Sequence, residues 1–206
     1  MKTRVFNLII LDESGSMQCI RKEAIDSVNE TIQTIRSAET KNPDQEHIVS
    51  LVTFNDDVKT IYNCVPIKEV NELTDYNPSC CTALYDAMGM SLTALRGNVA
   101  ENDRVLVTVV TDGYENSSRE YGGKAIKSLV DELKGKGWVF AYIGANQDVE
   151  AVAATISITN TLSFSATSQG MKAMSKKVNS ARGNFYSELC SEDFDSVKAN
   201  KSFFKK

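Results

Sequence analysis

A regular alternation of two kinds of segment constrains the fold of this chain most strongly. Short runs such as residues 5–11 (VFNLIIL) and 105–110 (VLVTVV) are apolar almost throughout, which is typical of strands buried on both faces. Between such runs apolar residues recur with helical spacing, and after the first run they form one stripe from Ile20 to Ile35. Strands that alternate with helices predict right-handed crossovers. We therefore expect an α/β fold, a doubly wound and mostly parallel sheet with helices on both faces.

One hairpin interrupts the parallel order. Only Asn55, Asp56 and Asp57 separate the expected strands 48–54 and 58–65, so these two strands should pair antiparallel. The hairpin therefore adds one antiparallel edge strand to the sheet. Further strands are expected at 138–143 and 161–164, and further helices at 82–95, 125–133, 149–156 and 168–178.

The length of 206 residues suits a single domain with an appendage. We expect the domain over residues 1–180 and a C-terminal extension over residues 181–206. Apolar residues are too frequent in the extension for a simple solvated tail. They pack either on the domain or on a partner, and the sequence leaves both open.

Composition excludes several classes of protein. A net charge of −4 without a dense basic face argues against nucleic acid as a partner. No apolar stretch approaches the roughly 18 residues that a membrane span needs, and the first apolar run is too short for a signal peptide. Five cysteines, an odd number, favour reduced thiols and a cytoplasmic protein. The single histidine, His47, excludes zinc sites with several histidines and receives no function.

Oxygen-bearing side chains follow two of the apolar strands. Asp12 ends the first strand and Asp112 follows the strand 105–110, and ligands of open parallel sheets bind at such carboxyl ends. Ser14 and Ser16 alternate with Asp12, and Thr82 begins a predicted helix, so all three hydroxyls could face the same edge. Two carboxylates and three hydroxyls suit Mg²⁺, with Mn²⁺ or Ca²⁺ as alternatives.

These motifs resemble a known family. The string Asp12-Glu13-Ser14-Gly15-Ser16, followed by Thr82 and then by Thr111-Asp112-Gly113, is similar to the metal-ion-dependent adhesion site (MIDAS) of von Willebrand factor type A domains. Order and gaps of roughly 65 and 30 residues also agree, and the resemblance covers about residues 5–178. The positions that match are Asp12, Ser14, Ser16, Thr82 and Asp112.

The resemblance implies a function and roles for these residues. Such domains usually bind a protein through Mg²⁺, and a Glu or Asp of the partner completes the metal shell. The hydroxyls of Ser14, Ser16 and Thr82 would be direct ligands, and Asp12 and Asp112 would bind directly or through water. We therefore expect a protein-binding module and not an enzyme.

One departure from the family concerns the loop before Thr82. Many relatives have a Gly-Gly pair there, whereas this chain has Cys80-Cys81. Cysteine adopts a positive φ less easily than glycine, so the loop could differ. The adjacent thiols could bind a soft metal, form a redox switch or be ordinary small loop residues.

Two other functions are alternatives. One also uses an Asp directly after the first strand, and the other shares this fold class. A Mg²⁺-dependent phosphotransferase of the haloacid dehalogenase type needs a second acid two residues after its Asp nucleophile, and Ser14 occupies that place. A nucleotide-binding domain needs a G-x-G-x-x-G turn or a phosphate loop, and neither occurs. The phosphotransferase stays the alternative.

Overall fold

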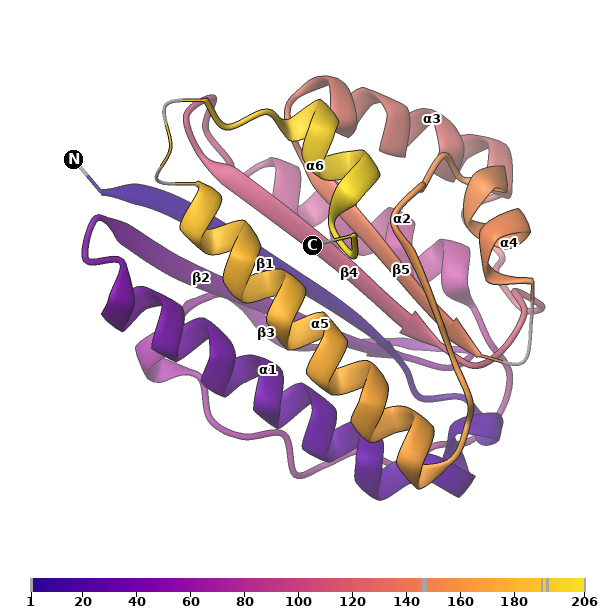
Figure 1. Ribbon diagram of the computed structural model, residues 1–206. Helices are drawn as coiled ribbons and strands as arrows, with labels where there is room; N and C mark the ends of the chain where they lie inside the picture. Colours follow the sequence, from indigo (N-terminus) through magenta and orange to yellow (C-terminus); the bar gives the residue numbers. More distant parts are fainter. Residues whose placement is uncertain (1, 146–147, 190, 192, 206) are drawn as a thin grey trace.

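A computed structural model describes residues 2–145, 148–189, 191 and 193–205. Its centre is a six-stranded sheet in the order β3-β2-β1-β4-β5-β6 (Figure 1). Neighbouring strands are parallel except β2 and β3, which form the antiparallel hairpin at one edge. This is the predicted fold class. The strands are β1 (Thr3–Asp12), β2 (Gln45–Phe54), β3 (Val58–Pro66), β4 (Arg104–Thr111), β5 (Val139–Ala145) and β6 (Thr161–Phe164).

Helices cover both faces of the sheet. In Figure 1, α1 and α5 lie in front of the sheet, and α2 and α3 lie behind it. None of the helices that the structure describes is long and apolar enough to cross a bilayer. The α-helices are α1 (Arg21–Lys41), α2 (Leu84–Arg96), α3 (Gly123–Gly135), α4 (Val149–Thr155), α5 (Ser168–Glu188) and α6 (Ser196–Ser202), with short 3-10 helices η1 (Gly15–Ile20) and η2 (Ile67–Glu69).

The core has two halves, one on each side of the sheet. In β1, Phe6, Leu8 and Ile10 pack towards α2 and α3. Alternate residues of the same strand, such as Ile9 and Leu11, pack towards α1 and α5. This is why the strand reads as a nearly continuous apolar run.

Two of the differences from the expected helices concern the predicted site and the C-terminal residues. The predicted helix 82–95 begins at Leu84, so Thr82 lies in the preceding loop. Tertiary hydrogen bonds hold the backbone there, since Ala83 N donates to the carbonyl of Asn55 at 2.7 Å. The predicted helix 168–178 continues to Glu188, and a further helix, α6, follows it.

The C-terminal residues pack on the sheet. Helix α5 continues across residue 180, where the sequence suggested the domain would end, and Phe185, Tyr186 and Phe203 are buried in the front half of the core.

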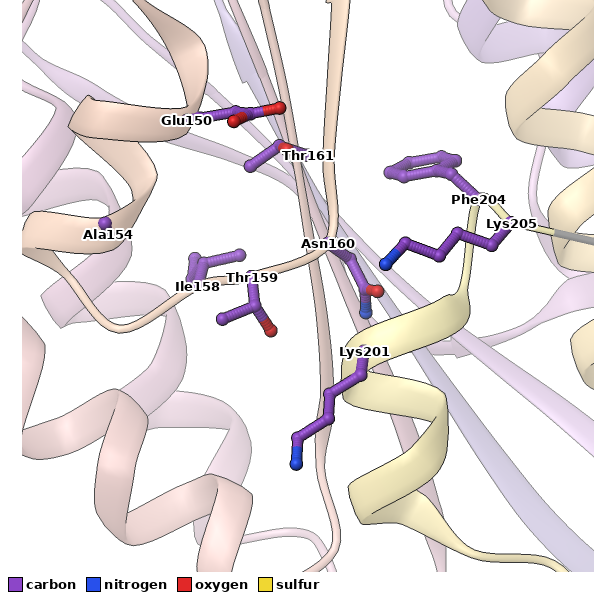
Figure 2. A pocket seen from close by; sticks show the side chains of 9 residues that line it. All are labelled: Glu150, Ala154, Ile158, Thr159, Asn160, Thr161, Lys201, Phe204 and Lys205. Carbon is purple, nitrogen blue, oxygen red and sulfur yellow. The ribbon is translucent and has the colours of Figure 1, made fainter.

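Between α4, the start of β6 and the C-terminal segment a pocket of about 460 Å³ remains (Figure 2), with Lys201 and Lys205 on one side and Glu150 on the other. It contains none of the five predicted metal ligands. Residues 1 and 206, the outer limits of the predicted domain and extension, lie outside the described residues.

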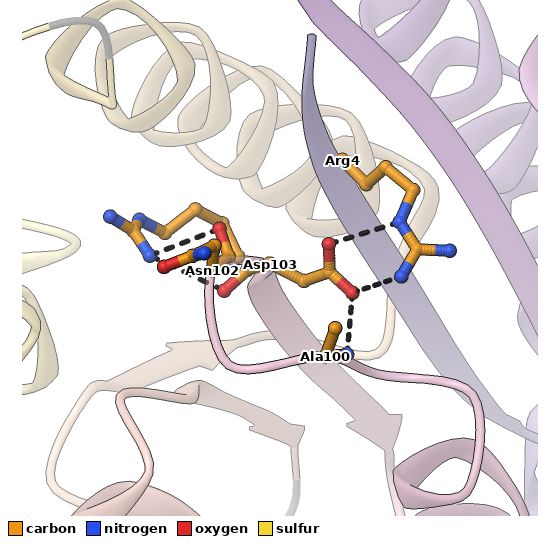
Figure 3. A network of polar contacts seen from close by, with 5 residues as sticks. Arg4, Ala100, Asn102 and Asp103 are labelled. Carbon is orange, nitrogen blue, oxygen red and sulfur yellow. Dashed lines mark hydrogen bonds and ion pairs between the residues drawn. The ribbon is translucent and has the colours of Figure 1, made fainter. Parts of the chain in front are cut away.

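An ion pair joins the starts of β1 and β4, at the end of the sheet opposite to the predicted metal site. Arg4 donates two hydrogen bonds to Asp103, from Nε at 3.0 Å and from Nη2 at 2.5 Å (Figure 3). The same carboxylate accepts from the backbone N–H of Ala100 at 2.6 Å. These contacts lie where the parallel pairing of β1 and β4 begins, and Asp12 and Asp112 lie where it ends.

Candidate metal centre

The loop after β1 turns three polar side chains towards one place. Asp12 is fully buried, and its Oδ1 accepts a hydrogen bond from the backbone N–H of Ser14 at 2.7 Å. The hydroxyls of Ser14 and Ser16 lie 3.1 Å apart. Tyr76, also buried, donates from its hydroxyl to the Asp12 carbonyl at 2.5 Å and so supports the loop from below.

Asp112, which directly follows β4, joins this group. Its Oδ1 accepts a hydrogen bond from the Ser16 hydroxyl at 2.5 Å, which directly links two of the sequence motifs. Its Oδ2 is buried and has no hydrogen-bond partner among the described residues. A buried carboxylate oxygen without a donor points to a missing cationic or donor group.

Thr82 faces the same space. A Cβ atom placed on Gly113 would lie 3.2 Å from Thr82 Oγ1, 3.7 Å from Ser16 Oγ and 3.9 Å from Asp12 Oδ2. Oxygens from three separate segments therefore surround one point beside Gly113, where the absence of a side chain leaves room. The structure thus brings all five predicted residues together, and their role as ligands stays a prediction.

Several residues support the site through contacts that the sequence did not predict. Thr111, the residue before Asp112, donates from its hydroxyl to Asp12 Oδ2 at 2.5 Å. Asn116 holds Thr82 on both sides, because its Oδ1 accepts from Thr82 N at 2.9 Å and its own N–H donates to the Thr82 carbonyl at 3.0 Å. Thr111 precedes Asp112 directly and Asn116 follows it by four residues, so their place near the site could be expected from the sequence, whereas their hydrogen bonds could not.

Glu115 positions the start of α2. Its carboxylate accepts hydrogen bonds from Tyr85 N at 2.9 Å, Ser117 N at 2.9 Å and Ser118 N at 2.8 Å. Glu115 therefore satisfies a backbone donor of the first helical turn and ties the 114–122 loop to it. Tyr114 remains 55 % exposed at the rim.

The two carboxylates lack a positive partner. Burial raises the pKa of Asp12 to about 6, against the opposing effect of its hydrogen bonds from Thr111 and Ser14. Burial likewise raises the pKa of Asp112. Neither forms an ion pair with Lys or Arg within the described part of the chain. A bound cation would remove the cost of burying these charges.

The donor set fits a hard dication. It offers carboxylate and hydroxyl oxygens only, which Mg²⁺ and Mn²⁺ accept. Over the described ranges, no cluster of three or more His, Cys, Asp or Glu side chains is arranged to hold a metal ion. A site with soft or nitrogen ligands of that size is therefore not available in the described residues.

The Cys80-Cys81 loop adopts the conformation that glycine favours. Cys80 has φ of +61°, in the left-handed region, and both cysteines are exposed. The Cys80 carbonyl accepts from Gly15 N at 3.2 Å, so the loop still contacts the turn that carries Ser14 and Ser16.

Comparisons with known proteins agree with this geometry. A family model described as von Willebrand factor type A domain matches residues 8–180. No curated protein matches the sequence.

Solved structures show the same fold at low sequence identity. The D319A mutant of the PilB minor pilin from Streptococcus sanguinis has a TM-score of 0.61 at 12 % identity, over 92 % of this chain and 63 % of that chain. The ArnB paralog VWA2 from Sulfolobus acidocaldarius has a TM-score of 0.60 at 16 % identity, over 86 % of this chain and 44 % of that chain. Proximal thread matrix protein 1 from the mussel byssus, described with a zinc-occupied MIDAS motif, has a TM-score of 0.59 at 15 % identity, over 88 % of this chain and 46 % of that chain. The matches thus span less than two thirds of these chains.

Proposed function

The chain belongs to the von Willebrand factor type A family, and from this premise we propose that it is a divalent-cation-dependent protein-binding module. Mg²⁺ would be held by Asp12, Ser14, Ser16, Thr82 and Asp112, and a Glu or Asp of the partner protein would complete the metal shell. Domains of this family are commonly used for metal-dependent protein interaction.

One observation carries the proposal. The unpaired Oδ2 of Asp112 is buried beside a group of hydroxyls from three segments of the chain. The hydroxyls are neutral, so at most two carboxylates offset the charge of a dication. A bound Mg²⁺ would stay electrophilic and keep water molecules that an incoming carboxylate can replace.

The residues of this chain have separate tasks in the proposal. Asp12 is held by Thr111 and by Ser14 N, so it supplies negative charge from a fixed position. Asp112 offers a free oxygen, and Asn116 holds Thr82 at the rim. The description of zinc in the MIDAS motif of the mussel protein supports a divalent cation at this place in the fold. The oxygen-only donors here favour Mg²⁺.

No observation favours the phosphotransferase alternative. Ser14, at the position of the required second acid, contacts the hydroxyl of Ser16. The neighbouring acid, Glu13, is turned to Asn77, whose backbone N–H it accepts at 2.5 Å. Neither is arranged as a general acid for a leaving group.

A calorimetric titration with Mg²⁺ and Mn²⁺ tests the cation site. We expect binding by the wild-type chain and its loss in Asp12→Ala and in Asp112→Ala. Asp56→Ala is the matched control, because this carboxylate is exposed in the β2–β3 turn and its removal should leave the affinity unchanged. Unchanged affinity in both site variants would refute the assignment.

A pull-down from source-cell lysate tests the partner. Capture should depend on Mg²⁺, disappear with a chelator and fail with Asp112→Ala. A captured protein should lose its binding when its acidic residues at the contact are replaced by amides. Capture that persists in the presence of the chelator would contradict a metal-bridged contact.

A further inference from the structure

The pair Cys80 and Cys81 carries a feature that the proposed cation site does not explain. Cys80 adopts a φ of +61°, which glycine accepts without cost and cysteine does not. Strained residues of this kind cluster where their side chain is used. Of the described residues with this conformation, Cys80 is the one whose carbonyl contacts the turn that carries Ser14 and Ser16.

Both thiols are open to reagents. Cys80 and Cys81 are exposed, and neither forms a disulfide. They are adjacent in the chain, so once an oxidant has reacted with one thiol, the neighbouring thiol can attack it and complete a disulfide. Exposure and a neighbouring resolving thiol are two of the properties that redox-sensitive cysteines share.

Closing a disulfide between them must move the backbone. Adjacent Cα atoms lie about 3.8 Å apart across a trans peptide, whereas disulfides usually join Cα atoms roughly 4.4–6.8 Å apart. The described residues contain no cis peptide bond, so the peptide between the two cysteines is trans. A disulfide here therefore distorts the local chain and is easily reduced again.

This backbone is part of the cation site. The Cys80 carbonyl accepts the hydrogen bond of Gly15, between Ser14 and Ser16, and Thr82 directly follows Cys81. Thr82 N in turn donates to Asn116 Oδ1 at 2.9 Å. A shift of residues 80 and 81 thus pulls on two of the segments that supply oxygens.

We propose that Cys80 and Cys81 form a reversible redox switch, in which a disulfide between them displaces Thr82 and weakens the cation site. The expected loss of cation affinity rests on the proposed function, whereas the expected disulfide rests on the geometry of the loop. With hydrogen peroxide as oxidant, two S–H bonds and the O–O bond break, and one S–S bond forms. Two electrons and two protons pass to the peroxide, which leaves as two water molecules.

The experiment treats the full chain with hydrogen peroxide and then with a dithiol reductant. Peptide mapping by mass spectrometry identifies the bonded cysteines, a Mn²⁺ titration measures affinity, and hydrogen exchange follows residues 79–84. We expect a Cys80–Cys81 disulfide, a fall in Mn²⁺ affinity of about tenfold or more, and recovery on reduction.

Three variants make the test specific. Cys80→Gly suits the left-handed backbone and lacks one thiol, and Cys81→Ser lacks the other, so both should keep their Mn²⁺ affinity in peroxide. Among the described residues, Cys19 carries the other exposed thiol near the site, with its Sγ 3.4 Å from the carbonyl oxygen of Ser16. Cys19→Ser should respond like the wild type.

The outcomes separate the two proposals. A disulfide to Cys19, a disulfide between molecules, or a Cys80–Cys81 disulfide with unchanged Mn²⁺ affinity overturns the switch. If the reduced wild type binds no Mn²⁺, the proposed function fails. In that case the loop is still tested, because unchanged hydrogen exchange at 79–84 on oxidation overturns the proposed displacement.

Discussion

At the scale of single residues, the space beside Gly113 offers a direct test of where the cation would bind. A Cβ there would approach the Thr82 hydroxyl to 3.2 Å and the Ser16 hydroxyl to 3.7 Å. Gly113→Ala should therefore lower Mg²⁺ and Mn²⁺ affinity by about tenfold or more, with little loss of stability. Gly122→Ala is the matched control, because its added Cβ would meet no atom within 4 Å. Equal Mn²⁺ titrations for the two variants would show that the cation does not occupy this space.

His47 gives a prediction for the dependence of stability on pH. Burial, and then the charge of Arg182, lower its pKa from 6.5 to about 4. The unfolded chain takes up the proton first, so stability is fully present above pH 6.5 and declines as the pH falls towards 4. The loss attributable to His47 should reach about 3 kcal/mol.

Urea unfolding between pH 7.5 and 4 checks this, with His47→Gln as the comparison. The raised pKa of Asp12 acts in the opposite direction, and subtracting the variant's pH profile removes that contribution. Parallel profiles for the two proteins would show that His47 is protonated equally in the folded and unfolded states.

At the scale of elements, the parts that could be predicted are those that local patterns determine. The buried strands were visible because β1 and β4 are apolar on both faces. The Asp12 and Asp112 positions followed from the ends of these strands. The start of α2 was wrong by two residues because a distant residue, Asn116, binds the backbone of Thr82. No local signal could reveal that contact.

The second half of α5 was missed for a related reason. Arg182 reads as a surface residue in the sequence, yet it is fully buried. Its guanidinium donates to Thr108 Oγ1 at 2.6 Å and to the Tyr186 hydroxyl at 3.1 Å. These partners come from β4 and from the next turn of the helix, so the pairing depends on the tertiary fold.

The buried Arg182 leads to a prediction for α5. It forms no ion pair with a carboxylate in the described part of the chain, and its Nε has no hydrogen-bond partner there. A buried charge without a counter-ion is costly, so Arg182→Met should raise the free energy of unfolding by about 1 kcal/mol or more. Denaturant unfolding measures this. Arg182→Ala should instead destabilise, because it leaves a cavity. Destabilisation by both would mean that the hydrogen bonds outweigh the cost of the charge.

At the scale of the whole molecule, the C-terminal residues complete the front half of the core. Phe185 and Tyr186 of α5 are buried. Asn200 of α6 accepts a hydrogen bond from Phe140 N at 3.0 Å and donates one to the Trp138 carbonyl at 2.8 Å. The family model matches only to residue 180, in the middle of α5. Residues beyond the end of this match therefore still pack into the core.

A chain that ends at residue 180 should consequently fail to fold stably. Truncating one buried Phe to Ala usually costs about 3–5 kcal/mol, and whole domains are stable by about 5–15 kcal/mol. Loss of Phe185 and Tyr186 together with the last turns of α5 should remove most of this free energy of unfolding. A chain that ends at residue 189 keeps α5 but loses α6 and the buried Phe203, so it should fold with a lower melting temperature. Circular dichroism during heating compares both with the full chain. A cooperative transition at the full chain's temperature in the 1–180 protein would show that residues 181–206 are an independent appendage.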